Sequence, residues 1–404
     1  MPELKKKLIK EEITITSKST DLSVDNKSQS YSSMYQDWKM INDIMAGDRA
    51  IKKAGESYIP KLEGQQINQY DAYLSRGVFF NAFARTVQGL TGAITRKSAV
   101  VEVPEKLNPV LDSFTQDGSP LDKTIRSITQ TILSKGYCGI LADLGENDTP
   151  YVSIYQPLDI INFKTIKVNG KMTLRMLVLK ERVEVENPLN PFESNITDQI
   201  RVLFLDDTGW LTINLYQFET GIKGASSKWI QVPINEEFDY QPSVIGGAKL
   251  DYIPFTFFGS EETSYSPQKP PLLDLAYLNI KHWQVNVDYY YALHICALPT
   301  PWAAGFTQEE GKNLRIGPGT AWVSSEPEAK CGFLEFTGQG LQAIENALSN
   351  LEKQMAVIGA RLLEEQKKGV ETAESMEIRA GGDTANLASI SLSIERGFKQ
   401  VLVY

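Results

Sequence analysis

The chain is poor in the side chains that build most metal centres and acid–base sites. Its 404 residues include two histidines, and three cysteines at Cys138, Cys296 and Cys331. No Cys-x-x-Cys pair occurs, which excludes a zinc ribbon, and three scattered cysteines are too few for a disulfide framework. We therefore expect reduced thiols that pack as small hydrophobic side chains.

Long apolar runs and an excess of basic charge are also missing. No segment approaches the ~18 apolar residues that span a bilayer, and the basic residues of Met1–Lys7 are not followed by the apolar stretch of a signal peptide. Lys and Arg number 41 against 50 Asp and Glu, a formal net charge of -9. This balance argues against a protein that grips nucleic acid over a broad basic face, although not against one that DNA slides past. A cytosolic protein, or part of a particle assembled in the cytosol, is indicated.

Known catalytic motifs are absent. There is no GxSxG, GxGxxG, GxxxxGK[ST] or HExxH sequence. His282 and His294 are expected on one helix but about 120° apart around it, so they cannot bind one metal on one face. Adjacent carboxylates such as Asp206-Asp207 are typical of solvated loops. We therefore expect no catalytic residue, no metal and no cofactor, and a protein that is not an enzyme.

What is present is the composition of an average soluble chain, with 42% apolar and 23% charged residues. The length predicts two or three domains. Residues 1–30 are polar, which predicts a flexible N-terminal arm. Apolar residues at spacings of three and four predict helices over about 31–54, 68–95 and 119–135.

The middle of the chain changes to a pattern that predicts strands. Asn169-Gly170 stands between two such runs and predicts a tight hairpin. Residues 96–258 are therefore expected to form a β-rich domain. The predicted strands cover 139–143, 151–155, 172–179, 199–204 and 210–216.

Two apolar repeats with a period of seven follow, and each predicts one side of a long helix. They bracket a Gly- and Pro-rich, β-like segment at 298–337. At 1.5 Å per residue each helix would be about 40 Å long and poorly covered within one chain. Copies that cover each other in a ring, or a helical hairpin packed on the β domain of a monomer, explain the pattern equally well. The first repeat contains Leu275, Leu278, His282, Val285 and Tyr289, and the second contains Leu341, Ile344, Leu348, Leu351, Met355, Ile358 and Leu362.

Several short motifs occur in a particular order along 31–404. They are Gly47–Gly55, Val87–Lys97, Gly136–Asp143, Ile253-Pro254-Phe255, Pro271–Leu275 and Asn279–Trp283. In this order and spacing the chain resembles the portal proteins of tailed bacteriophages (head-to-tail connectors), in particular a branch formerly catalogued as a domain of unknown function.

The resemblance implies an α+β fold with a characteristic layout. After the arm at 1–30, an α/β wing leads to a hairpin of two stem helices with a small β clip between them. A tunnel loop and a last long helix lead back to the wing and crown, although the chain ends too early to hold much of a crown. The implied parts are the wing at 31–266, the first stem helix at 267–297, the clip at 298–337, the second stem helix at 338–363, the tunnel loop at 364–372 and the last helix at 373–404.

The resemblance also implies a structural role without catalysis. Portal proteins look like rings, usually of twelve subunits, at one capsid vertex, and double-stranded DNA passes through the central hole. Their partners are the terminase large subunit, the major capsid and scaffold proteins, and a head–tail adaptor that docks on the clip. The candidate docking residues here are Trp302, Trp322 and Phe333. The implied location is the virion, assembled in the host cytoplasm.

A duplex that must pass without sticking favours an acidic channel lining, because basic groups bind phosphates through counterion release. The candidate contacts at the narrowest point are Lys367, Lys368 and Gly369 in the tunnel loop, and Arg361 near the end of the second stem helix. A solvated loop tip explains the two lysines equally well. Arg361 is as well suited to pairing with a carboxylate of a neighbouring subunit.

Two other functions stay open. A tail or baseplate adaptor would share the oligomerisation but not a channel as wide as DNA. A hydrolase that uses an Asp/Glu pair on the β domain would be a monomer or dimer with a pocket and a divalent-ion requirement.

Overall fold

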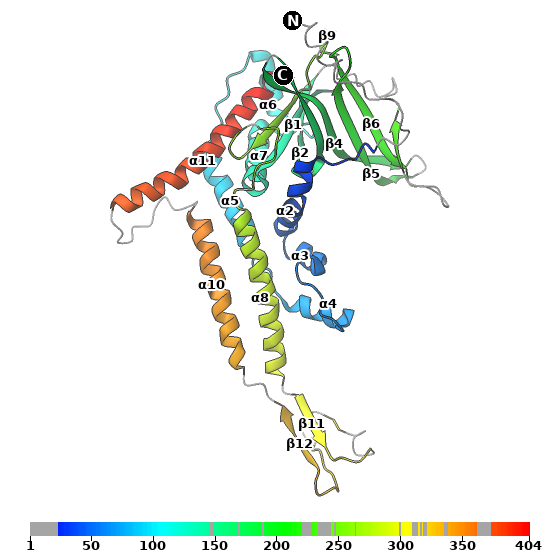
Figure 1. Cartoon of the computed structure of the whole chain (residues 1–404), viewed down its shortest axis with the longest axis vertical. Coiled ribbons are helices and arrows are strands. Elements are labelled where there is room, and N and C mark those ends of the chain that lie inside the picture. Colours follow the sequence, from blue (N-terminus) through cyan, green and yellow to red (C-terminus); the bar gives the residue numbers. More distant parts are fainter. Residues whose placement is uncertain are drawn as a thin grey trace. The chain divides into compact units, whose positions relative to one another are not determined.

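The structure is a computed structural model (Figure 1), and the chain divides in it into two compact units. The first unit comprises Met1–Asn42, Ala84–Leu273 and Ala360–Tyr404, and the second comprises Asp43–Phe83 and Asp274–Gly359. The described residues are 23–145, 149–168, 170–187, 190–219, 228–232, 244–245, 248–262, 264–298, 300–308, 314–315, 317, 321–334, 338–361 and 373–404.

Antiparallel sheets dominate the first unit. One sheet has the strand order β10-β1-β2, another has the order β3-β4-β5-β6-β7, and β8 and β9 form a short pair. All five predicted strands form. The strands are β1 Tyr137–Leu144, β2 Pro150–Tyr155, β3 Ile160–Val168, β4 Lys171–Asn187, β5 Asn190–Leu205, β6 Leu211–Glu219, β7 Lys228–Val232, β8 Val244–Ile245, β9 Ala248–Lys249 and β10 Phe255–Gly259.

The hairpin predicted at Asn169-Gly170 joins β3 to β4. Val168 pairs with Lys171 across the turn, and Gly170 has a φ of 78°, a conformation that glycine adopts without strain. Helices and antiparallel strands occupy separate stretches of the chain, so the predicted α+β class is confirmed.

Two of the predicted helices are each broken into shorter helices in the structure. The helix predicted over 31–54 is divided at Gly47, which has a φ of 87°, and the one predicted over 68–95 is interrupted at 77–81. The helices are α2 Gln29–Ala46, α3 Asp48–Ala54, α4 Ile67–Arg76, α5 Ala82–Ile94, α6 Asn108–Asp112, α7 Leu121–Lys135, α8 Leu273–Ala297, α10 Gln339–Arg361 and α11 Ala373–Val401, with short 3-10 turns at Gly55–Ser57, Glu105–Leu107 and Pro157–Asp159.

The main core of the first unit contains side chains from both larger sheets and from α2. Leu177 of β4, Leu203 of β5 and Phe257 of β10 are buried in it together with Trp38. The Trp38 indole N–H donates a hydrogen bond to the Lys135 carbonyl at 3.1 Å, so this large side chain is buried with its polar atom satisfied.

The end of α11 packs against β10. A Cβ atom at Gly397 would lie 2.3 Å from a ring atom of Phe258, so only glycine lets the helix approach this closely. Ser393 donates a hydrogen bond to the Gly259 carbonyl at 2.9 Å, and the Phe398 and Phe258 rings lie 5.2 Å apart. The last helix is thereby fixed to the three-stranded sheet.

Part of the expected arm is ordered. Residues 1–22 lie outside the described residues, but the Ser28 amide donates to the Ile161 carbonyl at 3.0 Å, and α2 begins at Gln29. Residues 43–83, which the sequence places in the wing, make up the second unit together with 274–359. The second unit also contains β11 Thr300–Ala304 and β12 Lys330–Leu334.

Candidate functional site: the long helices and the hairpin between them

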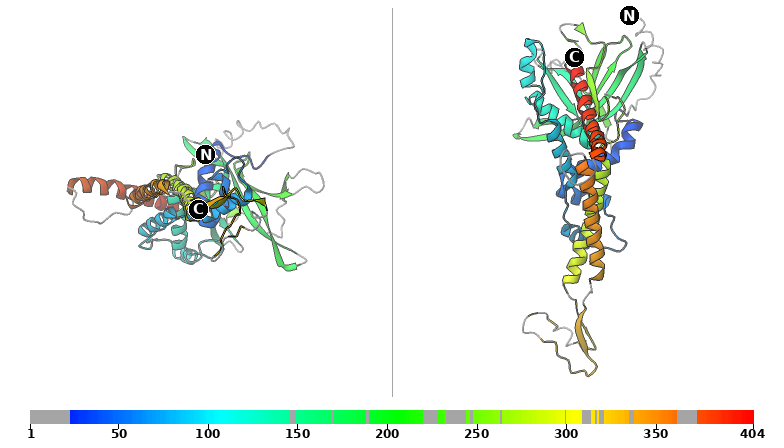
Figure 2. Two further views of the ribbon diagram at one scale, coloured as in Figure 1. Left: turned by 90° about the horizontal axis from the view of Figure 1, so that it is seen from below. Right: turned by 90° about the vertical axis from the view of Figure 1, so that its left-hand side faces the viewer.

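Two long helices and a small β-hairpin form the most distinctive part of the second unit. Figure 1 and the right-hand view of Figure 2 show α8 and α10 side by side, with β11 and β12 between them in the chain. With 25 and 23 residues, the helices are each about 35 Å long. His282 Nε2 lies 3.3 Å from Glu352 Oε1, which joins the two helices directly.

The predicted apolar repeats are partly buried in the single chain. Leu275 and His282 of α8 are buried, as are Leu348 and Met355 of α10. The other members keep part of their surface exposed, so one chain does not cover the repeats completely. These half-buried members are Leu278, Val285, Tyr289, Leu341, Ile344, Leu351 and Ile358. Leu362 lies outside the described residues.

A second face of α8 is buried against residues 77–83, and the sequence pattern did not reveal it. Asn286 Oδ1 accepts a hydrogen bond from the Val78 amide at 2.8 Å. Asn279 accepts one from the Phe83 amide at 2.9 Å and donates one to the Phe80 carbonyl at 2.8 Å. The two asparagines are seven residues apart and therefore share one helix face. Their spacing was the available signal, since buried asparagines need partners.

The asparagine contacts explain why the helix predicted over 68–95 is interrupted. The interruption frees backbone amides from helical bonding, and the asparagine side chains of α8 accept two of them. The segment lies close to α8, because a Cβ at Gly77 would be 2.4 Å from Val287 Cγ2. Gln284 adds a hydrogen bond to the Tyr58 carbonyl at 2.7 Å. A propensity pattern within 68–95 carries no information about these acceptors.

The hairpin of β11 and β12 has little core of its own. Trp302 pairs with Gly332 across the strands, and the side chains of Trp302 and Phe333 are 43% and 59% exposed. Every residue of β12 is exposed or half-buried. The half-buried Trp322 donates its indole N–H to the Arg315 carbonyl at 2.8 Å. A two-stranded sheet this exposed is marginally stable in water unless something packs on it.

Of the candidate DNA contacts, only Arg361 is among the described residues. Arg361 is the last residue of α10, whereas Lys367, Lys368 and Gly369 lie outside the described residues. Their proposed contact with DNA stays a prediction. The two histidines do not meet: His294 Nε2 lies 3.0 Å from an Arg76 nitrogen, while His282 is paired with Glu352.

Carboxylates that could act as a hydrolytic pair do come together on the β domain, although not the adjacent pairs considered from the sequence. Arg201 Nε lies 2.7 Å from Glu181 Oε1, and Arg201 Nη1 lies 3.5 Å from Asp143 Oδ2. Burial raises the pKa of Asp143 to about 6, against the opposing effect of Arg201. The guanidinium lies between the carboxylates, where a metal or a substrate would have to bind. Asp206 instead accepts the amides of Thr208 and Trp210, at 2.8 Å and 3.0 Å, within a turn.

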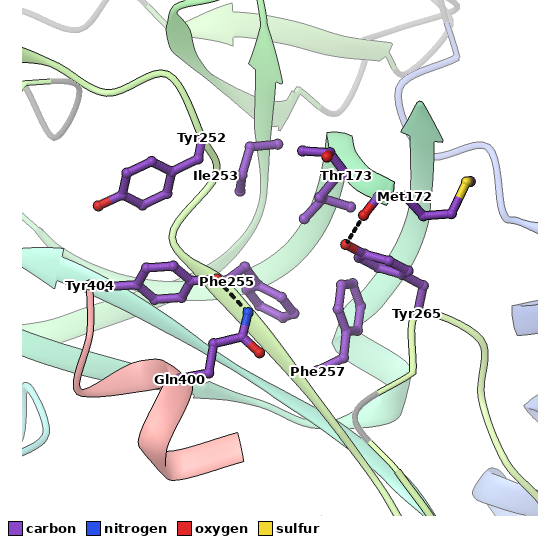
Figure 3. A pocket seen from close by; sticks show the side chains of 10 residues that line it. Met172, Thr173, Tyr252, Ile253, Phe255, Phe257, Tyr265, Gln400 and Tyr404 are labelled. Carbon is purple, nitrogen blue, oxygen red and sulfur yellow. Dashed lines mark hydrogen bonds between the residues drawn. The ribbon is translucent and has the colours of Figure 1, made fainter. Parts of the chain in front are cut away.

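A pocket of about 250 Å³ lies in the first unit (Figure 3). Its lining is uncharged and rich in aromatic side chains, and two hydrogen bonds join lining residues to one another. The Tyr265 hydroxyl donates to the Met172 carbonyl at 3.1 Å, and the Gln400 amide donates to the Tyr404 hydroxyl at 2.8 Å. The lining contains no carboxylate, histidine, lysine, arginine or cysteine. The lining residues are Met172, Thr173, Leu174, Tyr252, Ile253, Phe255, Phe257, Tyr265, Gln400 and Tyr404.

The described part of the chain offers neither a metal-binding cluster nor a membrane-spanning helix. It contains no group of three His, Cys, Asp or Glu side chains arranged to hold a metal ion. None of its helices is long and apolar enough to cross a membrane.

Comparison with known proteins gives one family match. The model of a domain of unknown function, DUF4055, matches residues 271–404. This range contains α8, β11, β12, α10 and α11. No curated protein matches the chain.

Solved structures resemble the chain weakly. A chain from the virion of a native gene transfer agent particle is 12% identical, with 85% of this chain and 86% of that chain covered and a TM-score of 0.35. A chain from the neck of an empty gene transfer agent particle is 10% identical, with 81% and 82% covered and a TM-score of 0.34. Scores this low decide neither the fold nor the function.

Proposed function

We propose that this protein is a structural component of a phage-like virion, and specifically its portal protein. In this role it forms a ring at one capsid vertex, through which double-stranded DNA is packaged and ejected. It has no catalytic site. The observation that carries the proposal is the pair of long helices whose apolar repeats are incompletely covered in one chain, together with the exposed hairpin between them.

The incomplete cover of the repeats favours association of identical subunits. Leu341, Ile344 and Leu351 of α10 and Tyr289 of α8 keep apolar surface exposed along one line of each helix. Burying such surface contributes about 25 cal/mol per Å². A contact between α10 of one subunit and α8 of the next is heterologous, and heterologous contacts that close form a ring. Twelve subunits is the number that the resemblance to portal proteins suggests.

The charge of the chain suits passage of DNA. A net charge of -9 per subunit disfavours tight binding of phosphates, because the chain has no excess of basic groups that could neutralise phosphates and release the counterions of the DNA. Local contacts with the duplex are assigned to Lys367, Lys368 and Gly369, and to Arg361 at the end of α10. We expect these residues to touch the backbone without sequence preference.

The exposed hairpin suits docking of a head–tail adaptor. Trp302 and Phe333 present large aromatic surfaces, which are enriched at the energetic centres of interfaces. We assign adaptor docking to these two residues and Trp322. The terminase large subunit and the major capsid and scaffold proteins are the other proposed partners.

The test is the assembly state of the purified protein. We expect negative-stain electron microscopy to show rings with a central hole at least as wide as duplex DNA, and light scattering to give a mass of about twelve subunits. Solid oligomers without a hole would favour a tail or baseplate adaptor. A chain that stays monomeric at high concentration, also when co-expressed with its scaffold protein, would contradict the proposal.

A further inference from the structure

Three charged side chains meet between the two larger sheets of the first unit. Asp143 comes from β1 of the three-stranded sheet, while Glu181 comes from β4 and Arg201 from β5 of the five-stranded sheet. Their side chains are 3%, 15% and 16% exposed. Two carboxylates therefore share one guanidinium away from bulk water. With both ionised, the cluster would hold one uncompensated negative charge, which is costly in such surroundings.

Glu181 is the more strongly bonded of the two carboxylates. Glu181 accepts hydrogen bonds from Arg201 Nε at 2.7 Å, from the Tyr155 hydroxyl at 2.6 Å and from the Gln199 amide at 2.9 Å. Hydrogen bonds of this number and length stabilise the charged form of a carboxyl group.

The contacts of Asp143 are weaker, and they identify the carboxyl that takes up a proton. Its Oδ2 lies 3.5 Å from Arg201 Nη1 and 3.4 Å from the Tyr151 hydroxyl, and its Oδ1 accepts the neighbouring Leu144 amide at 3.0 Å. It is also the most deeply buried of the three charged groups.

We propose that Asp143, Glu181 and Arg201 form a proton-binding site that makes the contact between the two sheets depend on pH, with Asp143 as the group that binds the proton. Protonated Asp143 leaves Glu181 and Arg201 as a neutral, well-bonded pair. Ionised Asp143 competes with Glu181 for Arg201 and adds an unpaired charge between the sheets.

The direction of the effect follows from the carboxyl group. Burial is the largest influence and raises the pKa of Asp143 to about 6, and Glu181 acts in the same direction. Arg201, the Leu144 amide and the Tyr151 hydroxyl lower it. A carboxyl with a raised pKa in the folded state destabilises that state when ionised. The contact is therefore strongest below the ordinary Asp range and weakens as the pH rises through about 6.

The experiment compares wild type with Asp143→Asn in thermal unfolding between about pH 4 and about pH 8. Asparagine has the same shape and no charge to bury. We expect the variant to melt several degrees higher than wild type by a constant amount above about pH 6, and the difference to shrink below pH 6 toward zero near the ordinary Asp pKa of about 4. The matched control is Asp198→Asn on β5, whose side chain is 42% exposed and pairs with Lys180 at 2.7 Å. Its difference from wild type should stay constant with pH.

A direct readout keeps the test independent of the variant's stability. The infrared band of a protonated carboxyl group should appear in the wild-type protein with a midpoint near pH 6, the pH above which the melting difference has its full size, and Asp143→Asn should lack it. A midpoint in the ordinary Asp range of about 4 would overturn the proposal. So would a melting difference that does not change with pH. The site does not depend on the proposed portal role, so either can fail alone.

Discussion

The two units differ in how completely their apolar side chains are buried within a single chain. In the first unit, Leu177, Leu179 and Ile200 are fully buried between or against sheets of the same chain. In the second unit, α10 buries Leu348 and Met355 of its apolar repeat and leaves Leu341, Ile344, Leu351 and Ile358 partly exposed. The core of the first unit is therefore complete within one chain at these positions. The second keeps partly exposed apolar surface, which under the proposed function is covered by another copy of the chain.

The largest effect is expected for Met355→Asp. Met355 is 2% exposed, and an unpaired charge there costs about 3–5 kcal/mol. Rings should be lost in electron micrographs, while hydrogen exchange in β1 and β4 stays at the wild-type rate. Gln354→Asp, one position along and exposed, is the control and should still form rings. Normal rings from Met355→Asp would show that the repeat does not carry assembly.

Trp38→Ala tests the buried core of the first unit instead of the helices of the second. Loss of this buried indole should cost about 3–5 kcal/mol, because it leaves a cavity and deprives the Lys135 carbonyl of its donor. Denaturant unfolding measures the loss, and Lys39→Ala, at an exposed neighbour, should change little. If Trp38→Ala unfolded like wild type, the first unit would not depend on this core.

A smaller effect is expected for Asn286→Ala within the second unit. The change leaves the Val78 amide without its acceptor, which costs about 1–3 kcal/mol. Hydrogen exchange at 77–83 should accelerate. The exposed Lys281→Ala should leave exchange at these amides unchanged. Equal exchange rates in both variants would mean that other contacts hold the segment on α8.

The smallest effect is expected for Glu352→Gln. Glu352 pairs with His282 at 3.3 Å but is 57% exposed, and exposed pairs contribute less than about 1 kcal/mol. The unfolding midpoint should therefore barely move, with Glu345→Gln on the same helix as the control. A loss as large as that of Met355→Asp would mean that the pair, rather than apolar contact, joins the helices.

Strands and helices were predictable where the apolar periodicity within a segment determines its secondary structure. Alternation identified the strands around Leu177 and Leu203, and the repeats at Leu275 and Leu341 identified both long helices. The interruption at 77–81 was not predictable in this way, because its cause is a pair of asparagine acceptors about 200 residues later in the chain. Local propensity cannot report a partner so distant.

The charged cluster between the sheets was missed for a related reason. Asp143, Glu181 and Arg201 come from three strands, and only the pairing of β4 with β5 and the packing of β1 against them brings the side chains together. Carboxylates adjacent in sequence, such as Asp206-Asp207, were the visible candidates. Strand partners and sheet packing would have been needed to find the real cluster.

The contact of α11 with β10 also constrains how the protein is made. Gly397, Ser393 and Phe398 complete the surface of a sheet whose strands were synthesised more than a hundred residues earlier. All of the second unit's helical hairpin emerges from the ribosome between these two parts. The first unit therefore cannot finish folding co-translationally before the second unit has been made, and β10 stays uncovered in the nascent chain. A chaperone or an early partner that shields this sheet would act in that interval.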